Sequence, residues 1–197
     1  MKAFKILTLI VLCSIIHLNK IYAQKDYVIT SSKDTIFCDI RGSFFSNNLK
    51  YRANKKDKFT PITSADIIEY FLADDTTTFV AKSLPRKVYR YTPYLKLLER
   101  GRINLYDQQV ASGSQGQTTS FWYASKGSDS LKLIKVSGIT LGGVGSRKQR
   151  EQAFMDLISD FPSLLEGFKT KAYTFENIQD CIVVYNSEYL INNKFIK

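Results

Sequence analysis

The chain has 197 residues, with 28 lysines and arginines against 18 acidic residues, and a formal net charge of +10. This length corresponds to one ordinary domain with a hydrophobic core of its own. The positive charge favours anionic partners. A single histidine, His17, excludes most histidine-dependent catalysis and zinc binding.

The first 23 residues have the order of a secretory signal peptide. A basic start, Met1–Lys5, precedes the apolar run Ile6–Leu18, and the small residue Ala23 precedes Gln24. The apolar run is shorter than the roughly 20 residues that a membrane-spanning helix needs. We therefore expect cleavage after Ala23 and export to the periplasm or the outer surface, with a retained anchor as the alternative. No second long apolar run follows, so no transmembrane span is expected in the mature chain.

Cleavage at this point also removes His17 and Cys13. Without histidine, the mature chain has no base for a serine or cysteine nucleophile and no histidine ligand for zinc. It contains neither a Ser-x-x-Lys nor a Gly-x-Ser-x-Gly motif. No catalytic residue, metal site or cofactor is therefore predicted, and nucleic acid is not an expected partner outside the cytoplasm.

Residues 24–138 predict a series of strands joined by polar turns. The expected strands are Tyr27–Thr30, Thr35–Ile40, Leu49–Arg52, Ile67–Phe71, Thr76–Lys82, Tyr94–Leu98, Ile103–Tyr106, Phe121–Tyr123 and Leu131–Val136. Three turns, at 31–34, 99–102 and 126–130, predict hairpins between their flanking strands. The segment Val110–Thr119 is small and polar and predicts a flexible loop tip.

Residues 146–197 have helical spacing. Ser146 and Gln149 fit a capping box, and apolar residues at three- and four-residue steps predict one helix extending to Phe161. Pro162 is placed to begin a second helix and Thr174 to cap a third. The polar tail, Asn186–Lys197, is expected to fray.

Strands followed by helices indicate an α+β fold: an antiparallel β-rich N-terminal part built of hairpins, with three C-terminal helices packing on it. The expected organisation is a signal peptide at 1–23, a β-rich part at 24–138, a glycine-rich joint at 139–145 and a helical part at 146–197. The β-rich and helical parts are expected to form one compact domain.

The order of several short motifs resembles a group of exported Bacteroidota proteins. The motifs are Asp26–Thr30, Lys33–Ile36, Leu95–Leu105, Leu157–Pro162 and Ile182–Asn186. That group shares a "gly-asp-thr-ile" hairpin, a β-rich middle and a helical end. This chain departs from the pattern at Lys33 and Cys38, where the group often has glycine. The resemblance implies the layout and an exported location, and it implies no catalytic residue.

The carboxylates allow one catalytic alternative. Asp156 and Asp160 are four residues apart on the first predicted helix, and Asp74 and Asp75 share a turn. Glycosidases work with two carboxylates alone. Helical surfaces and turns carry such residues routinely, so solvation is the competing interpretation.

The segment from Lys82 to Arg102 concentrates positive charge and tyrosine, with Glu99 as its one acid. Arginine and tyrosine together suit sugar rings, acidic groups and protein contacts. A solvated edge strand is the alternative. The candidate binding face consists of Arg86, Lys87, Tyr89, Arg90, Tyr91 and Tyr94.

Cys38 and Cys181 remain in the mature chain, and two arrangements are open. They form a disulfide in an oxidising compartment, or they are separate buried thiols, which their apolar neighbours favour.

The sequence favours an exported envelope protein that binds or scaffolds a partner without catalysis. The partner classes are an anionic envelope glycan, a lipid head group or a protein. The alternatives are a carboxylate-dependent hydrolase acting on envelope glycan and a subunit of a larger surface assembly.

Overall fold

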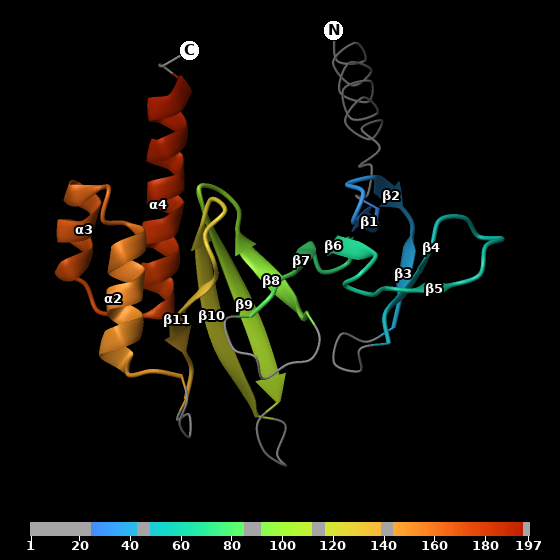
Figure 1. The fold of residues 1–197 in the computed structure, drawn as a ribbon, viewed down its shortest axis with the longest axis horizontal. Coiled ribbons are helices and arrows are strands. Elements are labelled where there is room, and N and C mark those ends of the chain that lie inside the picture. The colour runs from blue at the N-terminus through green and yellow to red at the C-terminus, as the bar shows by residue number, and fades with distance from the viewer. Residues whose placement is uncertain (1–24, 43–47, 85–91, 112–116, 139–143, 195–197) are drawn as a thin grey trace, which may run out of the picture.

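A computed structural model of the chain describes residues 25–42, 48–84, 92–111, 117–138 and 144–194. These residues form eleven strands followed by three helices, which is the predicted α+β order (Figure 1). The strands are β1 (Tyr27–Thr30), β2 (Thr35–Phe37), β3 (Asp39–Arg41), β4 (Lys50–Arg52), β5 (Thr60–Pro61), β6 (Ile67–Leu72), β7 (Thr77–Ala81), β8 (Tyr94–Glu99), β9 (Ile103–Ala111), β10 (Thr118–Lys126) and β11 (Lys132–Val136). The helices are α2 (Arg147–Leu157), α3 (Pro162–Lys169) and α4 (Phe175–Lys194).

The main sheet has eight strands in the order β11-β10-β9-β8-β7-β6-β1-β2, and all its pairings are antiparallel. The three predicted hairpins are present as β1–β2, β8–β9 and β10–β11. Alternating apolar residues set their register, because one face of each strand must be buried. In the first hairpin Ile36 contacts the core, whereas its neighbour Phe37 is exposed.

A second, three-stranded sheet, β3-β4-β5, packs against the N-terminal half of the main sheet. The chain passes from β2 to β3 at Cys38, whose amide donates to the carbonyl of Asp26 (3.0 Å). The core between the two sheets is buried and apolar; it contains Val28, Cys38, Leu49, Ile62, Ile67, Tyr70 and Phe79.

The three helices cover the other half of the main sheet, over β8 to β11. Ser146 and Gln149 form the predicted capping box, and Pro162 is the first residue of α3. Thr174 accepts from the amide of Asn177 (3.2 Å) at the start of α4. The buried residues beneath the helices include Ile103, Leu105, Phe154, Ile158, Ile178 and Ile182.

Several sequence predictions about the bounds of elements are wrong. The predicted strand Thr35–Ile40 is divided at Cys38 into β2 and β3, which belong to different sheets. The predicted loop Val110–Thr119 includes strand residues at both ends, because β9 continues to Ala111 and β10 begins at Thr118, whereas its centre, 112–116, lies outside the described residues. The first helix ends at Leu157 and does not reach Phe161, where the following Pro162 disfavours helical geometry. The tail does not fray at Asn186, because α4 continues to Lys194 and buries Asn186.

The alternatives for the cysteines are resolved. Cys38 and Cys181 are both free and buried, and they lie in different cores. Burial raises the pKa of each thiol to about 11, with nearby Asp26 and Asp39 adding to the effect at Cys38.

Within the described ranges, no helix is long and apolar enough to cross a membrane. The predicted signal peptide, residues 1–23, lies outside those ranges, as does most of the glycine-rich joint.

Candidate functional site

Most of the predicted binding face, namely Arg86, Lys87, Tyr89, Arg90 and Tyr91, lies outside the described residues. Tyr94 is described and is half-buried in β8. Its ring meets Tyr70 edge-on at 5.0 Å, and its hydroxyl donates to the carbonyl of Ile67 (2.7 Å). Tyr94 therefore has a structural role in the core between the sheets.

A different basic surface is fully described: strand β4 together with the turn that follows it, which we call the basic turn (residues 50–59). Its sequence contains five basic residues and one acid, Asp57. Four of the basic residues are exposed, and no ion pair found among the described residues involves them: Lys50, Lys55, Lys56 and Lys58. In Figure 1 this turn extends outward at the end of the molecule opposite the helices.

The fifth basic residue, Arg52, holds the turn to the sheet. Two of its N–H groups donate to Oδ2 of Asp39 at 3.1 and 3.0 Å, and a third donates to the carbonyl of Lys55 (3.2 Å). Its guanidinium also lies over the ring of Phe59, 4.7 Å from the centroid, and Arg41 approaches the same ring at 5.1 Å. Arg52 of β4 therefore contacts β3 through Asp39, the turn through Lys55 and the start of the return to β5 through Phe59.

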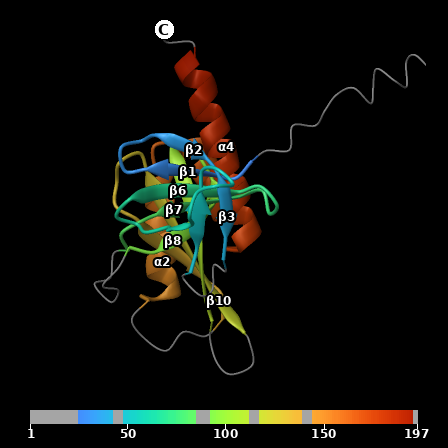
Figure 2. The same ribbon diagram turned by 90° about the vertical axis from the view of Figure 1, so that its right-hand side faces the viewer.

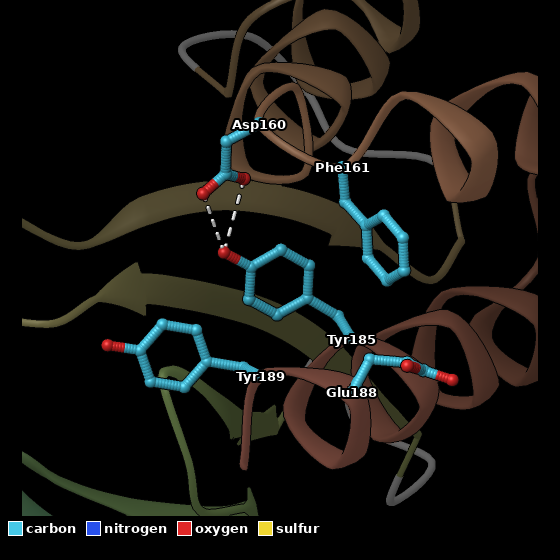
Figure 3. A pocket seen from close by; sticks show the side chains of 5 residues that line it. All are labelled: Asp160, Phe161, Tyr185, Glu188 and Tyr189. Atoms are coloured by element: carbon cyan, nitrogen blue, oxygen red, sulfur yellow. Dashed lines mark hydrogen bonds between the residues drawn. The ribbon is translucent and has the colours of Figure 1, made fainter. Parts of the chain in front are cut away.

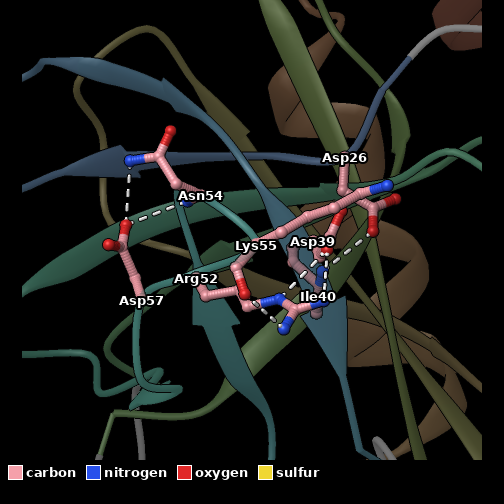
Figure 4. Close-up of polar contacts among 7 residues, drawn as sticks. All are labelled: Asp26, Asp39, Ile40, Arg52, Asn54, Lys55 and Asp57. Carbon is pink, nitrogen blue, oxygen red and sulfur yellow. Dashed lines mark hydrogen bonds and ion pairs between the residues drawn. The ribbon is translucent and has the colours of Figure 1, made fainter.

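The tip of the turn is closed by Asp57. Its Oδ2 accepts from both the main-chain amide (3.0 Å) and the side-chain amide (2.9 Å) of Asn54 (Figure 4). The main-chain amide of Asp57 donates back to the carbonyl of Asn54 (3.0 Å). These bonds hold the backbone that carries Lys55 and Lys56 in one conformation.

Asp26 joins the small sheet to the main sheet, and Figure 4 shows its bond to Ile40. Its Oδ2 accepts from the amide of Ile40 in β3 (3.0 Å), and its Oδ1 accepts from the amide of Ala73 after β6 (2.8 Å). The sheet that carries the basic turn is thus tied to the main sheet by hydrogen bonds.

The described residues also contain a small pocket beside α4, with a volume of about 130 Å³. Its lining combines carboxylates with aromatic rings: Asp160, Phe161, Tyr185, Glu188 and Tyr189 (Figure 3). Asp160 lies just before α3, whereas the last three come from α4.

Asp160 is occupied by partners from two other elements. Lys126 of β10 lies 2.6 Å from its Oδ1, and the hydroxyl of Tyr185 donates to both oxygens at 3.1 and 2.9 Å. Burial acts to raise the pKa of Asp160, but the bonds from Lys126 and Tyr185 outweigh burial and the pKa is lowered. In Figure 3 the carboxylate of Glu188 points away from Asp160.

This geometry does not favour the glycan hydrolase alternative. A glycosidase needs a protonated carboxylic acid with a raised pKa and a second carboxylate facing the same bond. Asp160 has the opposite shift, and Asp156 accepts instead from Gln152 on its own helix (2.8 Å). Asp74 and Asp75 are exposed in the turn between β6 and β7.

No group of three or more histidine, cysteine or acidic residues that could hold a metal ion occurs in the part of the chain that the structure describes. The pocket was not predictable from sequence, because Asp160 and Phe161 meet Tyr185, Glu188 and Tyr189 only through the packing of α4 against the segment before α3. The basic turn had a visible signal in the lysine-rich run 55–58, which the charge of the longer 82–102 segment obscured.

Comparison with known proteins gives no match: no family model, curated protein or solved structure is similar to this chain.

Proposed function

We propose that this chain is an exported envelope protein that acts as a binding module without catalysis, and that the basic turn captures an anionic partner. The observation that carries the proposal is the rigid, projecting turn with exposed Lys50, Lys55, Lys56 and Lys58. Export rests on the signal-like order of residues 1–23 and on the resemblance to exported Bacteroidota proteins.

The form of the turn favours binding over simple solvation. A basic segment that is only solvated needs no fixed conformation. Here the hydrogen bonds of Asp57, Asn54 and Arg52 hold the backbone of the turn in one conformation. Preorganised donors lose less entropy on binding. The compartment makes an acidic envelope glycan the partner that best fits this surface, ahead of a lipid head group or an acidic protein.

The test is retention on an immobilised acidic polysaccharide, heparin-agarose, during elution with salt. The variant Lys55→Gln/Lys56→Gln/Lys58→Gln is expected to elute at lower salt than the unsubstituted chain. A matched control, Lys33→Gln/Lys148→Gln/Lys171→Gln, removes the same charge from three exposed positions elsewhere. Exposed charges are screened over about 8 Å at physiological ionic strength, so position matters as well as net charge.

Equal elution of the two triple variants would refute a specific role for the basic turn. The predicted face in the 82–102 segment is tested in parallel with Arg86→Gln/Lys87→Gln/Arg90→Gln. If that variant alone loses retention, the binding site lies there instead. Uncharged agarose controls for retention by the matrix itself. Binding to phosphatidylglycerol vesicles without retention on heparin-agarose would indicate a lipid partner rather than a glycan.

A further inference from the structure

Helix α4 exposes an apolar stripe on the side opposite its buried face. Its buried residues, such as Ile178, Ile182 and Tyr185, pack on the sheet and on the loop before α3. The large exposed hydrophobic side chains of α4 are Val183 (41% exposed), Val184 (45%), Tyr189 (39%), Leu190 (61%) and Ile191 (50%). In the remainder of the described chain, only Phe37 and Ile68 are comparable.

The helix also projects. Figure 2 shows the C-terminal turns of α4 extending beyond the edge of the sheet and clear of the other helices. Four of the exposed residues, at positions 183, 184, 190 and 191, lie on one side of the helix at the spacing i, i+1, i+7 and i+8. These two exposed apolar pairs, with only the small residue Ser187 between them, form a candidate interaction surface.

The pattern of the stripe is symmetric about Ser187. Val184 and Leu190 lie three residues on either side of it, and Val183 and Ile191 lie four. An antiparallel pair of identical helices crossing at Ser187 therefore places Val183 opposite Ile191 and Val184 opposite Leu190 of the other copy. A two-fold interface requires such self-complementarity, since one patch must fit itself.

Charge follows the same symmetry. Asp180 is seven residues before Ser187, and Lys194, the last residue of α4, is seven residues after it. The antiparallel register therefore sets an acidic position of one copy opposite a basic position of the other at each end. Ser187 is small, and its hydroxyl already donates to the carbonyl of Val183 (2.9 Å), so it permits close approach without leaving a polar group unpaired.

We infer that α4 pairs antiparallel with α4 of a second copy of this chain, with the two-fold axis at Ser187. The pair buries the stripe on both copies and leaves the basic turn, at the opposite end of each molecule, exposed. This inference does not depend on the proposed function.

Sedimentation equilibrium of the intact chain tests the association. A reversible dimer is expected. Leu190→Glu should raise its dissociation constant by about tenfold or more, because a carboxylate would be buried against an apolar partner. Phe37→Ser, which removes the exposed side chain on β2, is the matched control and should leave the dimer unchanged.

Cysteine cross-linking tests the register. Ser187→Cys should form a disulfide between copies, because the axis brings the residue against itself. Val183→Cys should not, since its two copies lie eight helical residues, or about 12 Å, apart along the pair, beyond the roughly 7 Å that a disulfide spans. Mixing Val183→Cys with Ile191→Cys should restore cross-linking.

Cross-linking of the unsubstituted chain measures the contribution of its native cysteines and is subtracted from that of each variant. A monomer at all accessible concentrations would overturn the inference, including a monomer that instead binds lipid vesicles or another protein through α4. Equal cross-linking of Ser187→Cys and Val183→Cys would overturn the register.

Discussion

The side chain of Asn186 in α4 forms two hydrogen bonds with the main chain of Ile103 at the start of β9. Its Oδ1 accepts from the amide and its Nδ2 donates to the carbonyl, each at 2.9 Å, and the site is buried. One side chain thereby satisfies both polar groups of a strand residue 83 positions away. This contact fixes how the longest helix lies on the sheet.

Replacing Asn186 with alanine should therefore destabilise the fold. Both main-chain groups of Ile103 lose their partner in a buried site, at a cost of about 1–3 kcal/mol. Urea unfolding followed by circular dichroism measures the change. Asn177→Ala removes an exposed side-chain bond to the carbonyl of Ala172 and should cost less. Equal losses in the two variants would contradict the role of Asn186.

A second prediction concerns Gly101, which lies directly against the Asn186 side chain. A Cβ at position 101 would stand 2.4 Å from Cγ of Asn186. The asparagine cannot move aside without losing its bonds to Ile103, so Gly101→Ala should cost about 1–3 kcal/mol, the usual range for overpacking. In an Asn186→Ala background the same substitution should cost clearly less. A double-mutant cycle by urea unfolding measures this coupling, and strict additivity would count against it.

The fold could be predicted from sequence wherever a local pattern was sufficient. The polar turn at 31–34 marked the first hairpin, and Ser146 with Gln149 marked the start of α2. The alternation at Ile36, Cys38 and Ile40 predicted a single strand, which the structure divides at Cys38 into β2 and β3. The division of the strands into two sheets was not predictable, because it depends on which strand pairs with β6. That pairing brings Val28 opposite Tyr70, a contact between residues far apart in sequence.

The end of α4 and the candidate sites likewise depend on contacts between distant residues, which local sequence patterns do not reveal. Asparagine often indicates the end of a helix, and this suggested an end at Asn186. In the structure the side-chain amide of Asn186 bonds Ile103 of β9, and α4 continues to Lys194. The apolar stripe of α4 was hidden because Val183, Val184 and Ile191 look like core residues in a sequence. The basic turn was visible only as charge, whereas its rigidity comes from Asp39, Asn54 and Asp57 together.

The contributions of Asp160 and Asp107 to the free energy of unfolding should change in opposite directions with pH. Hydrogen bonds from Lys126 and Tyr185 outweigh burial and lower the pKa of Asp160, so its contribution is present above the unfolded pKa and is lost as pH falls through the folded pKa. The side chain of Asp160 is 55% exposed, so the effect should be under about 1 kcal/mol. Burial raises the pKa of Asp107, so its contribution is present below the unfolded pKa and is lost as pH rises through the folded one.

Urea unfolding between acidic and neutral pH measures both effects. Asp160→Asn should be less stable than the unsubstituted chain at neutral pH and equal to it at acidic pH. Asp107→Asn should be as stable as the unsubstituted chain or more so at neutral pH, because Oδ1 of Asp107 is buried and has no hydrogen-bond partner among the residues that the structure describes. A loss of stability at neutral pH in Asp107→Asn that exceeds the loss in Asp160→Asn would reverse the assignment.

The two buried thiols should be inert while the protein is folded. Burial raises the pKa of Cys38 and Cys181 to about 11, so almost no thiolate, the reactive form, is present at neutral pH. Iodoacetamide followed by peptide mass spectrometry should modify neither residue in buffer and both in urea. Rapid labelling of either cysteine under native conditions would show that its core opens.

The final prediction separates charge from rigidity in the basic turn. Asp57→Ala removes the only acid of the turn, so if net charge alone drives capture, this variant should bind an acidic polysaccharide more tightly. If the fixed backbone matters, loss of the bonds from Asn54 should loosen the turn and weaken capture. We expect weaker retention on heparin-agarose.

Asp74→Ala is the matched control, since it removes one exposed negative charge from the turn between β6 and β7. Its retention should be unchanged or slightly stronger. Folding is checked for both variants by urea unfolding, in which an exposed substitution of this kind usually changes stability by less than about 0.5 kcal/mol. If Asp57→Ala and Asp74→Ala both elute at higher salt by the same amount, then the hydrogen bonds that fix the turn do not contribute to binding.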